Sequence, residues 1–93
     1  MIKLTLDGEI RLSLLSATRA HKEYDSLKES YYLIQASNAC REKAKQTCLE
    51  IAKYAQRSLS EEEKRELAEL RRRKIDLDFT AHNLYQHAKI LIS

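Results

Sequence analysis

The feature that most constrains this chain is a row of residues in its second half that is mirrored in its first half. The row repeats with alternating steps of three and four residues and consists of Leu67, Leu70, Lys74, Leu77, Ala81, Leu84, Ala88 and Leu91. Such steps place side chains on one face of a helix. Reflection about Arg57–Ser60 places opposite this row Ile51, Cys48, Ala44, Arg41, Ser37, Ile34, Ser30 and Leu27.

Residues of similar size meet across this reflection. The matched pairs are Leu67/Ile51, Leu84/Ile34, Leu91/Leu27, Ala81/Ser37 and Ala88/Ser30. Small residues in facing positions let two helix axes approach closely. We therefore predict an antiparallel helical hairpin in which residues 27–58 pack against residues 61–92.

The composition agrees with an all-α chain. Its 93 residues allow one domain, 1–93, proline is absent, and Gly8 is the only glycine. The charged fraction is 33%, with both signs interleaved, which is typical of a solvated helical surface. Two helices of this composition bury a thin core, so we expect self-association or a partner, with assembly into a helical bundle.

The first fourteen residues have a different pattern. Apolar residues alternate strictly with polar ones from Ile2 to Leu14, and Asp7-Gly8 is a frequent hairpin dipeptide. Period-two alternation favours strand, so we predict an extended or β-hairpin segment over residues 1–14. The competing interpretation makes Asp7 the N-cap of a helix that begins at once.

The sequence also bears on two helix boundaries, one near residue 25 and one near residue 60. We favour a continuous helix over residues 15–58, because nothing between Ser16 and Asp25 forces a turn. The alternative is a break near residue 25, since Ser26 and Glu29 have capping-box spacing. Ser60 and Glu63 form a second such pair, which predicts the start of a last helix running to about Leu91.

A parallel zipper of two last helices competes with the hairpin. Leu70, Leu77, Leu84 and Leu91 recur every seventh residue, and flanking charges would pair attractively in a parallel dimer. However, Lys74, Ala81 and Ala88 are weak residues for the remaining core positions of such a dimer. The intrachain hairpin is therefore preferred, and it remains free to dimerise into a four-helix bundle.

Residues with reactive side chains form no recognisable catalytic or metal-binding pattern. Cys40 and Cys48 lie two helical turns apart, too far for a disulfide within one helix, and the reflection places Cys48 in the core. Asp78 and His82 are neighbours on one helix face, but two ligands do not make a metal site. We expect no enzyme activity and no cofactor.

The leading functional hypothesis is a non-catalytic helical interaction or assembly module, such as an adaptor, a small chaperone or a regulatory subunit. Its partner would be a second copy, giving a homodimer, or a helix of another protein. The apolar residues expected outside the hairpin seam are Leu12, Leu15, Tyr24, Leu27, Tyr31, Ile75 and Phe79. Tyrosine is favoured where one side of a ring is buried and the other is wet.

The alternative hypothesis is a small nucleic-acid-binding regulator. Its contacts would come from a basic set near the start of the last helix: Arg57, Lys64, Arg65, Arg71, Arg72, Arg73 and Lys74. The net charge of +3 is weak support, and four consecutive helical residues spread around the axis instead of forming one stripe. No apolar run approaches a membrane span and no leader is evident, so we expect a cytoplasmic location without membrane contact.

Overall fold

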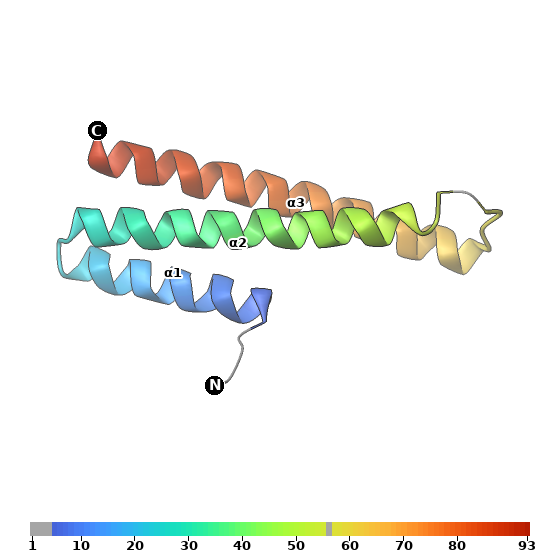
Figure 1. Cartoon of the computed structure of the whole chain (residues 1–93), viewed down its shortest axis with the longest axis horizontal. Helices are drawn as coiled ribbons and strands as arrows, with labels where there is room; N and C mark the ends of the chain where they lie inside the picture. Colours follow the sequence, from blue (N-terminus) through green and yellow to red (C-terminus); the bar gives the residue numbers. More distant parts are fainter. Residues whose placement is uncertain (1–4, 56) are drawn as a thin grey trace.

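The computed structural model describes residues 5–55 and 57–93. These residues form three helices, α1 (Leu6–Lys22), α2 (Ser26–Ala52) and α3 (Glu61–Ile92). The central helix, α2, runs antiparallel to both neighbours, and within the described chain it is the only helix that packs along both of them (Figure 1). The prediction of an all-α chain with a helical hairpin is therefore confirmed.

The three helices lie side by side in the half of the molecule that contains α1, whereas near the α2–α3 connection α3 crosses behind α2 (Figure 1). The principal extents are 53 × 33 × 16 Å, so the molecule is flat, although its shortest extent exceeds the diameter of about 10–12 Å of one helix. The radius of gyration is 16.3 Å, against roughly 12 Å for a compact domain of this length. The accessible surface is 7309 Å², against about 5,600 Å² for a compact monomer of this mass.

The seam between α2 and α3 follows the mirrored rows. The buried hydroxyl of Ser37 donates to the carbonyl oxygen of Ala81 at 2.7 Å, and that of Ser30 donates to the carbonyl oxygen of Ala88 at 3.1 Å. From residue 64 to the C-terminus, the side chains that are at least partly buried are those of the predicted row. The small pairs of the reflection therefore mark the closest approach of the two helices.

One predicted core residue lies outside the core. The side chain of Cys48 is exposed, so the prediction that the reflection buries it in the core was wrong. Helix α1 accompanies only one half of the hairpin, and Cys48 lies in the other half, where two helices alone cannot cover each other (Figure 1). Cys40, which lies alongside α1, is buried.

The extended segment predicted for the N-terminus is a helix over its described part. Helix α1 begins at Leu6, and Thr5 is its N-cap, accepting a hydrogen bond from the backbone N–H of Gly8 at 3.1 Å. Asp7 is therefore a first-turn residue and not the cap. Leu6, Ile10 and Leu14 are also spaced by four, so the alternating pattern contained a helical one. Residues 1–4 of the predicted segment lie outside the described residues.

A tight turn separates α1 from α2, so the favoured continuous helix was wrong and the break near residue 25 was correct. Tyr24 has a φ of 58°, and the N–H of Asp25 donates to the carbonyl oxygen of Ala20 at 2.9 Å. This is the Schellman arrangement that ends many helices. Asp25 then caps α2 through a hydrogen bond from the backbone N–H of Lys28 at 3.0 Å, which makes Ser26 a helical residue.

The predicted start of α3 is confirmed in detail. The backbone N–H of Glu63 donates to the Ser60 hydroxyl, and the backbone N–H of Ser60 donates to the Glu63 carboxylate, each at 3.2 Å. Arg57 adds an ion pair to Glu63 at 2.6 Å. These contacts tie the connection between α2 and α3 to the first turn of α3 and hold the pKa of Glu63 below its usual value, chiefly through the Ser60 backbone N–H.

The core of the fold is narrow and built from small side chains. Ala17 of α1, Leu33 of α2 and Ala88 of α3 form a buried cluster where the three helices come together. Ala36 and Cys40 are also almost fully buried on α2. Small residues bring the helices close but bury little apolar surface, so the larger apolar side chains remain mostly on the faces of the layer.

Candidate protein interaction surfaces

The two faces of the helical layer carry different side chains. Successive helical residues turn by about 100°, so Tyr31 and Glu42 lie to one side of the seam residue Ser37, and Lys43 and Thr47 lie to the other. We call the first side the tyrosine face and define it by Leu12 of α1, Leu27 and Tyr31 of α2, and Tyr85 and Ile92 of α3. Arg41 lies over the ring of Tyr85 at 5.8 Å, which places Tyr85 on this side of the seam.

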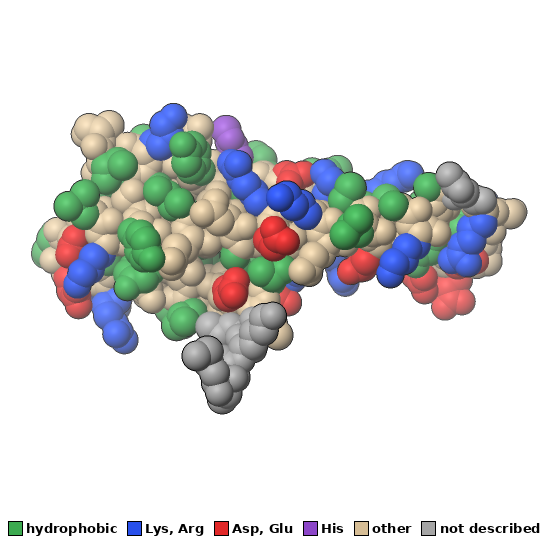
Figure 2. All heavy atoms as spheres, viewed as in Figure 1, with side chains coloured by type: hydrophobic (Ala, Val, Ile, Leu, Met, Phe, Trp, Pro, Cys, Tyr) green, Lys and Arg blue, Asp and Glu red, His purple; other side chains and the backbone are tan. Residues whose placement is uncertain are grey.

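The five residues that define the tyrosine face are all exposed. Leu27 is 75% exposed, Tyr31 57% and Leu12 53%, while Ile92 and Tyr85 are 53% and 39% exposed. Figure 2 shows hydrophobic side chains spread over the three-helix half, whereas charged side chains crowd the two-helix end. Single exposed apolar residues are ordinary, but a patch that spans three helices is typical of an interaction surface.

Polar contacts order this face. The side-chain amide of Gln35 donates to the Tyr31 hydroxyl at 2.8 Å, and the Tyr31 ring meets the ring of Tyr32 edge-on at 5.4 Å. Lys89 joins Arg41 over Tyr85, with its ammonium 5.5 Å from the ring centroid. These contacts restrict the side-chain rotamers of Tyr31 and Tyr85 within the chain.

The residues selected from sequence do not form one surface. Leu15 lies on the outer side of α1, and Tyr24 is 95% exposed in the turn. Ile75 and Phe79 are each 66% exposed and one turn apart on α3, on the side opposite its seam with α2. We call this pair the α3 ridge. Sequence reasoning missed Tyr85 and Ile92, although their spacing of seven residues beside the seam was a usable signal.

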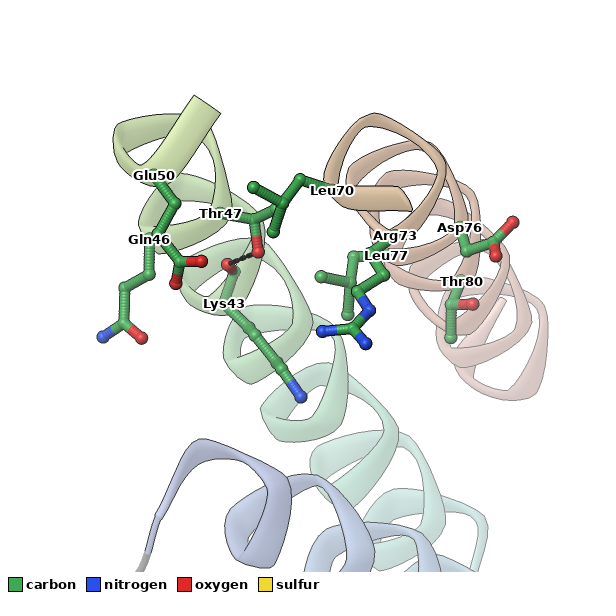
Figure 3. A pocket seen from close by; sticks show the side chains of 9 residues that line it. All are labelled: Lys43, Gln46, Thr47, Glu50, Leu70, Arg73, Asp76, Leu77 and Thr80. Carbon is green, nitrogen blue, oxygen red and sulfur yellow. Dashed lines mark hydrogen bonds between the residues drawn. The ribbon is translucent and has the colours of Figure 1, made fainter. Parts of the chain in front are cut away.

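The opposite face contains a groove of about 410 Å³ between α2 and α3, beyond the end of α1 (Figure 3). Leu70 and Leu77 form its apolar side, and Lys43 and Arg73 extend into it from opposite helices. Lys43 is paired with Asp7 of α1, and Arg73 lies 3.4 Å from Glu69. Both cations are therefore paired with carboxylates of the same chain, so neither Lys43 nor Arg73 gives the groove an unpaired positive charge.

A smaller pocket lies where α1, α2 and α3 meet. Its lining includes Glu29, whose side chain is only 8% exposed, together with His21 and His87. The Nδ1 atom of His21 lies 3.0 Å from a carboxylate oxygen of Glu29, so this hydrogen bond connects α1 to α2. Within residues 5–55 and 57–93, no three His, Cys, Asp or Glu side chains are grouped so that they could hold a metal ion.

The basic set proposed for nucleic acid is largely paired with carboxylates. The ion pairs are Arg57–Glu63, Lys64–Glu61, Arg73–Glu69 and Lys74–Asp78. The hydrogen bond to Asp78 raises the pKa of Lys74. Arg65, Arg71 and Arg72 are exposed; Arg65 and Arg72 are seven residues apart and share one side of α3, whereas Arg71 is turned by about 100° from Arg72. Most of the basic set is therefore neutralised within the chain, and two exposed arginines remain on one side of α3.

The two thiols have different surroundings. Burial raises the pKa of Cys40, against a smaller opposing effect from Lys43, so Cys40 is a poor nucleophile. Cys48 is exposed near the α2–α3 seam.

In comparisons with known proteins, no family model, curated protein or solved structure matches this chain. In the part of the chain that the structure describes, no helix is both long enough and apolar enough to cross a membrane.

Proposed function

We propose that this protein is a non-catalytic helical interaction module that binds a partner protein by burying apolar helix faces. One observation carries the proposal: a flat arrangement of three helices exposes large apolar side chains on the tyrosine face and on the α3 ridge. Domains normally bury such faces between two packed layers. A partner that covers either surface supplies the missing layer.

The excess surface supports the same proposal. The accessible surface exceeds that of a compact monomer of equal mass by about 1,700 Å². A stable protein interface removes roughly 800 Å² from each partner. The chain therefore has enough extra surface for a full interface without losing the packing that holds its own helices together.

Nucleic-acid binding through the basic set is the second candidate, favoured by the exposed side chains of Arg65, Arg71 and Arg72. Salt separates the two functions. Binding through 6–10 phosphates weakens by about 10³–10⁵ between about 50 mM and about 200 mM salt, whereas burial of apolar surface does not.

The test compares three variants, Phe79→Asp, Tyr31→Asp and Arg72→Gln, against wild type in binding assays at both salt concentrations. Phe79→Asp places a charge on the α3 ridge, and Arg72→Gln removes an exposed cation one turn from Ile75. The interaction proposal expects that binding of a protein partner tolerates salt. Either Phe79→Asp on the α3 ridge or Tyr31→Asp on the tyrosine face should abolish this binding. Arg72→Gln should leave the binding intact. Binding of RNA or DNA that is steeply salt-dependent and sensitive to Arg72→Gln would overturn it.

A further inference from the structure

We infer that the tyrosine face binds a second copy of this chain, face to face, so that two layers of three helices form one six-helix dimer. This inference rests on the proposed function, because it names the partner for one of the two apolar surfaces. It leaves the α3 ridge, on the outer edge of the layer, free for another protein.

The size of the face fits such a dimer. The residues that define the tyrosine face lie in the three-helix half of the molecule, and Leu49 continues the same side of α2 beyond α1. The accessible surface in excess of a compact monomer, about 1,700 Å², is larger than the roughly 800 Å² that each partner contributes to a stable interface. The two-helix end, where charged side chains dominate, would project beyond the dimer (Figure 2).

The face carries charges of both signs, and the exposed cations Arg19 and Lys28 lie on its α1 side. Arg41 and Lys89 flank the aromatic ring of Tyr85 on the α3 side. Glu9 and Glu42 line the groove between α1 and α2 on the other side. A twofold rotation about an axis parallel to α2 turns the second copy over and exchanges the two sides, so Arg41 of each copy meets the side of the other copy that carries Glu42.

The same rotation brings the apolar residues of the central helix together. Leu27 and Tyr31 lie on α2, near the axis, and would pack against Leu27 and Tyr31 of the second copy. A twofold interface is self-complementary, and tyrosine is enriched among the residues that dominate binding energy. In this arrangement Arg41 of one copy lies beside Glu42 of the other, because the two residues are at almost the same height along α2.

The first experiment is a sedimentation-equilibrium series over a wide range of protein concentration with a reducing agent. Wild type is expected to approach about 22 kDa, twice the 10.9 kDa of the chain. Leu27→Asp and Tyr31→Asp should each raise the dissociation constant by at least about 30-fold, the loss typical of a central interface residue. Phe79→Asp is the matched control, an equally exposed apolar residue off the face, and should leave the dimer unchanged.

The second experiment tests the orientation. Arg41→Glu and Glu42→Arg should each weaken the dimer, because each creates a like-charge contact twice, and the double variant should recover it. Circular dichroism confirms that each variant keeps its helices. A monomer at every concentration, a dimer lost only in Phe79→Asp, or a double variant without recovery overturns the inference. The proposed function fails separately, through the salt-dependent nucleic-acid binding described above.

Discussion

The hydroxyl of Ser37 donates a buried hydrogen bond of 2.7 Å to the backbone carbonyl of Ala81, and this contact marks the close approach of α2 and α3. A serine in this position both fits the narrow gap and satisfies its own hydroxyl. The same arrangement recurs seven residues away on each helix, between Ser30 and Ala88. The two contacts fix the register of the hairpin from within its core.

Substitutions at Ser37 should separate the effect of the hydrogen bond from the effect of size. Ser37→Ala should lower the free energy of unfolding by about 1 kcal/mol, because it removes one hydrogen bond and no volume. Ser37→Leu should cost clearly more, about 2–3 kcal/mol, by forcing the helices apart. Urea unfolding followed by circular dichroism measures both. Equal losses in the two variants would contradict the close packing.

Replacing Tyr24 by glycine should stabilise the folded chain. Its φ of 58° lies in the left-handed region, which costs a residue with a Cβ roughly 1 kcal/mol, and its side chain is 95% exposed. Tyr24→Gly should therefore raise the free energy of unfolding by about 1 kcal/mol. Tyr24→Ala keeps the Cβ and is the control, which should gain nothing from the backbone. If alanine and glycine stabilise the chain equally, backbone strain is not the cause.

Replacing His21 should destabilise the packing of α1 on α2. The carboxylate of Glu29 is nearly buried and receives its hydrogen bond from His21 at 3.0 Å. His21→Ala leaves that carboxylate without its partner, which should cost about 1–3 kcal/mol. The double variant His21→Ala with Glu29→Leu should recover much of this loss, as denaturant unfolding can show. A lasting deficit in the double variant would mean that His21 acts by other contacts.

The contribution of the Glu63 contacts at the start of α3 to the free energy of unfolding should decrease in acid. The pKa of Glu63 is lowered in the folded chain, so the unfolded chain binds the proton first as the pH falls. The contribution is present above the ordinary carboxylate pKa of about 4.3 and is lost as the pH falls through the lower folded value. Glu63→Gln should flatten this part of the stability curve. Glu62→Gln, its first-turn neighbour, is the control and should not.

The seam was predictable because it depends on local spacing. The row that ends with Ala88 and Leu91 gives the buried side of α3 directly, and its reflection gives the contacts of Ser30 and Ser37. The capping pair of Ser60 and Glu63 was equally local. Features of this kind need only the helical repeat and the chemistry of a helix end.

Other features were hidden because they depend on the whole fold. The alternation from Leu6 to Leu14 contains periods of two and four, and only packing on α2 decides between them. The turn at Tyr24 could not be predicted from the sequence, because the residue with positive φ is a tyrosine and not the glycine that usually ends a helix in this way. The exposure of Cys48 follows from the length of α1, and the tyrosine face likewise combines residues from three helices.

The central position of α2 has a consequence for how the molecule opens. Helix α1 packs along α2 and meets α3 only at the cluster of Ala17 and Ala88, so α1 can unfold while most of the α2–α3 seam remains intact. Native-state hydrogen exchange should then divide the amides into two cooperative groups, with α1 exchanging through an opening of lower free energy than the hairpin. Since Leu12 belongs to α1 and Tyr31 to α2, a ligand that spans both would slow exchange throughout α1, and the amides of one helix would report occupancy of the whole face.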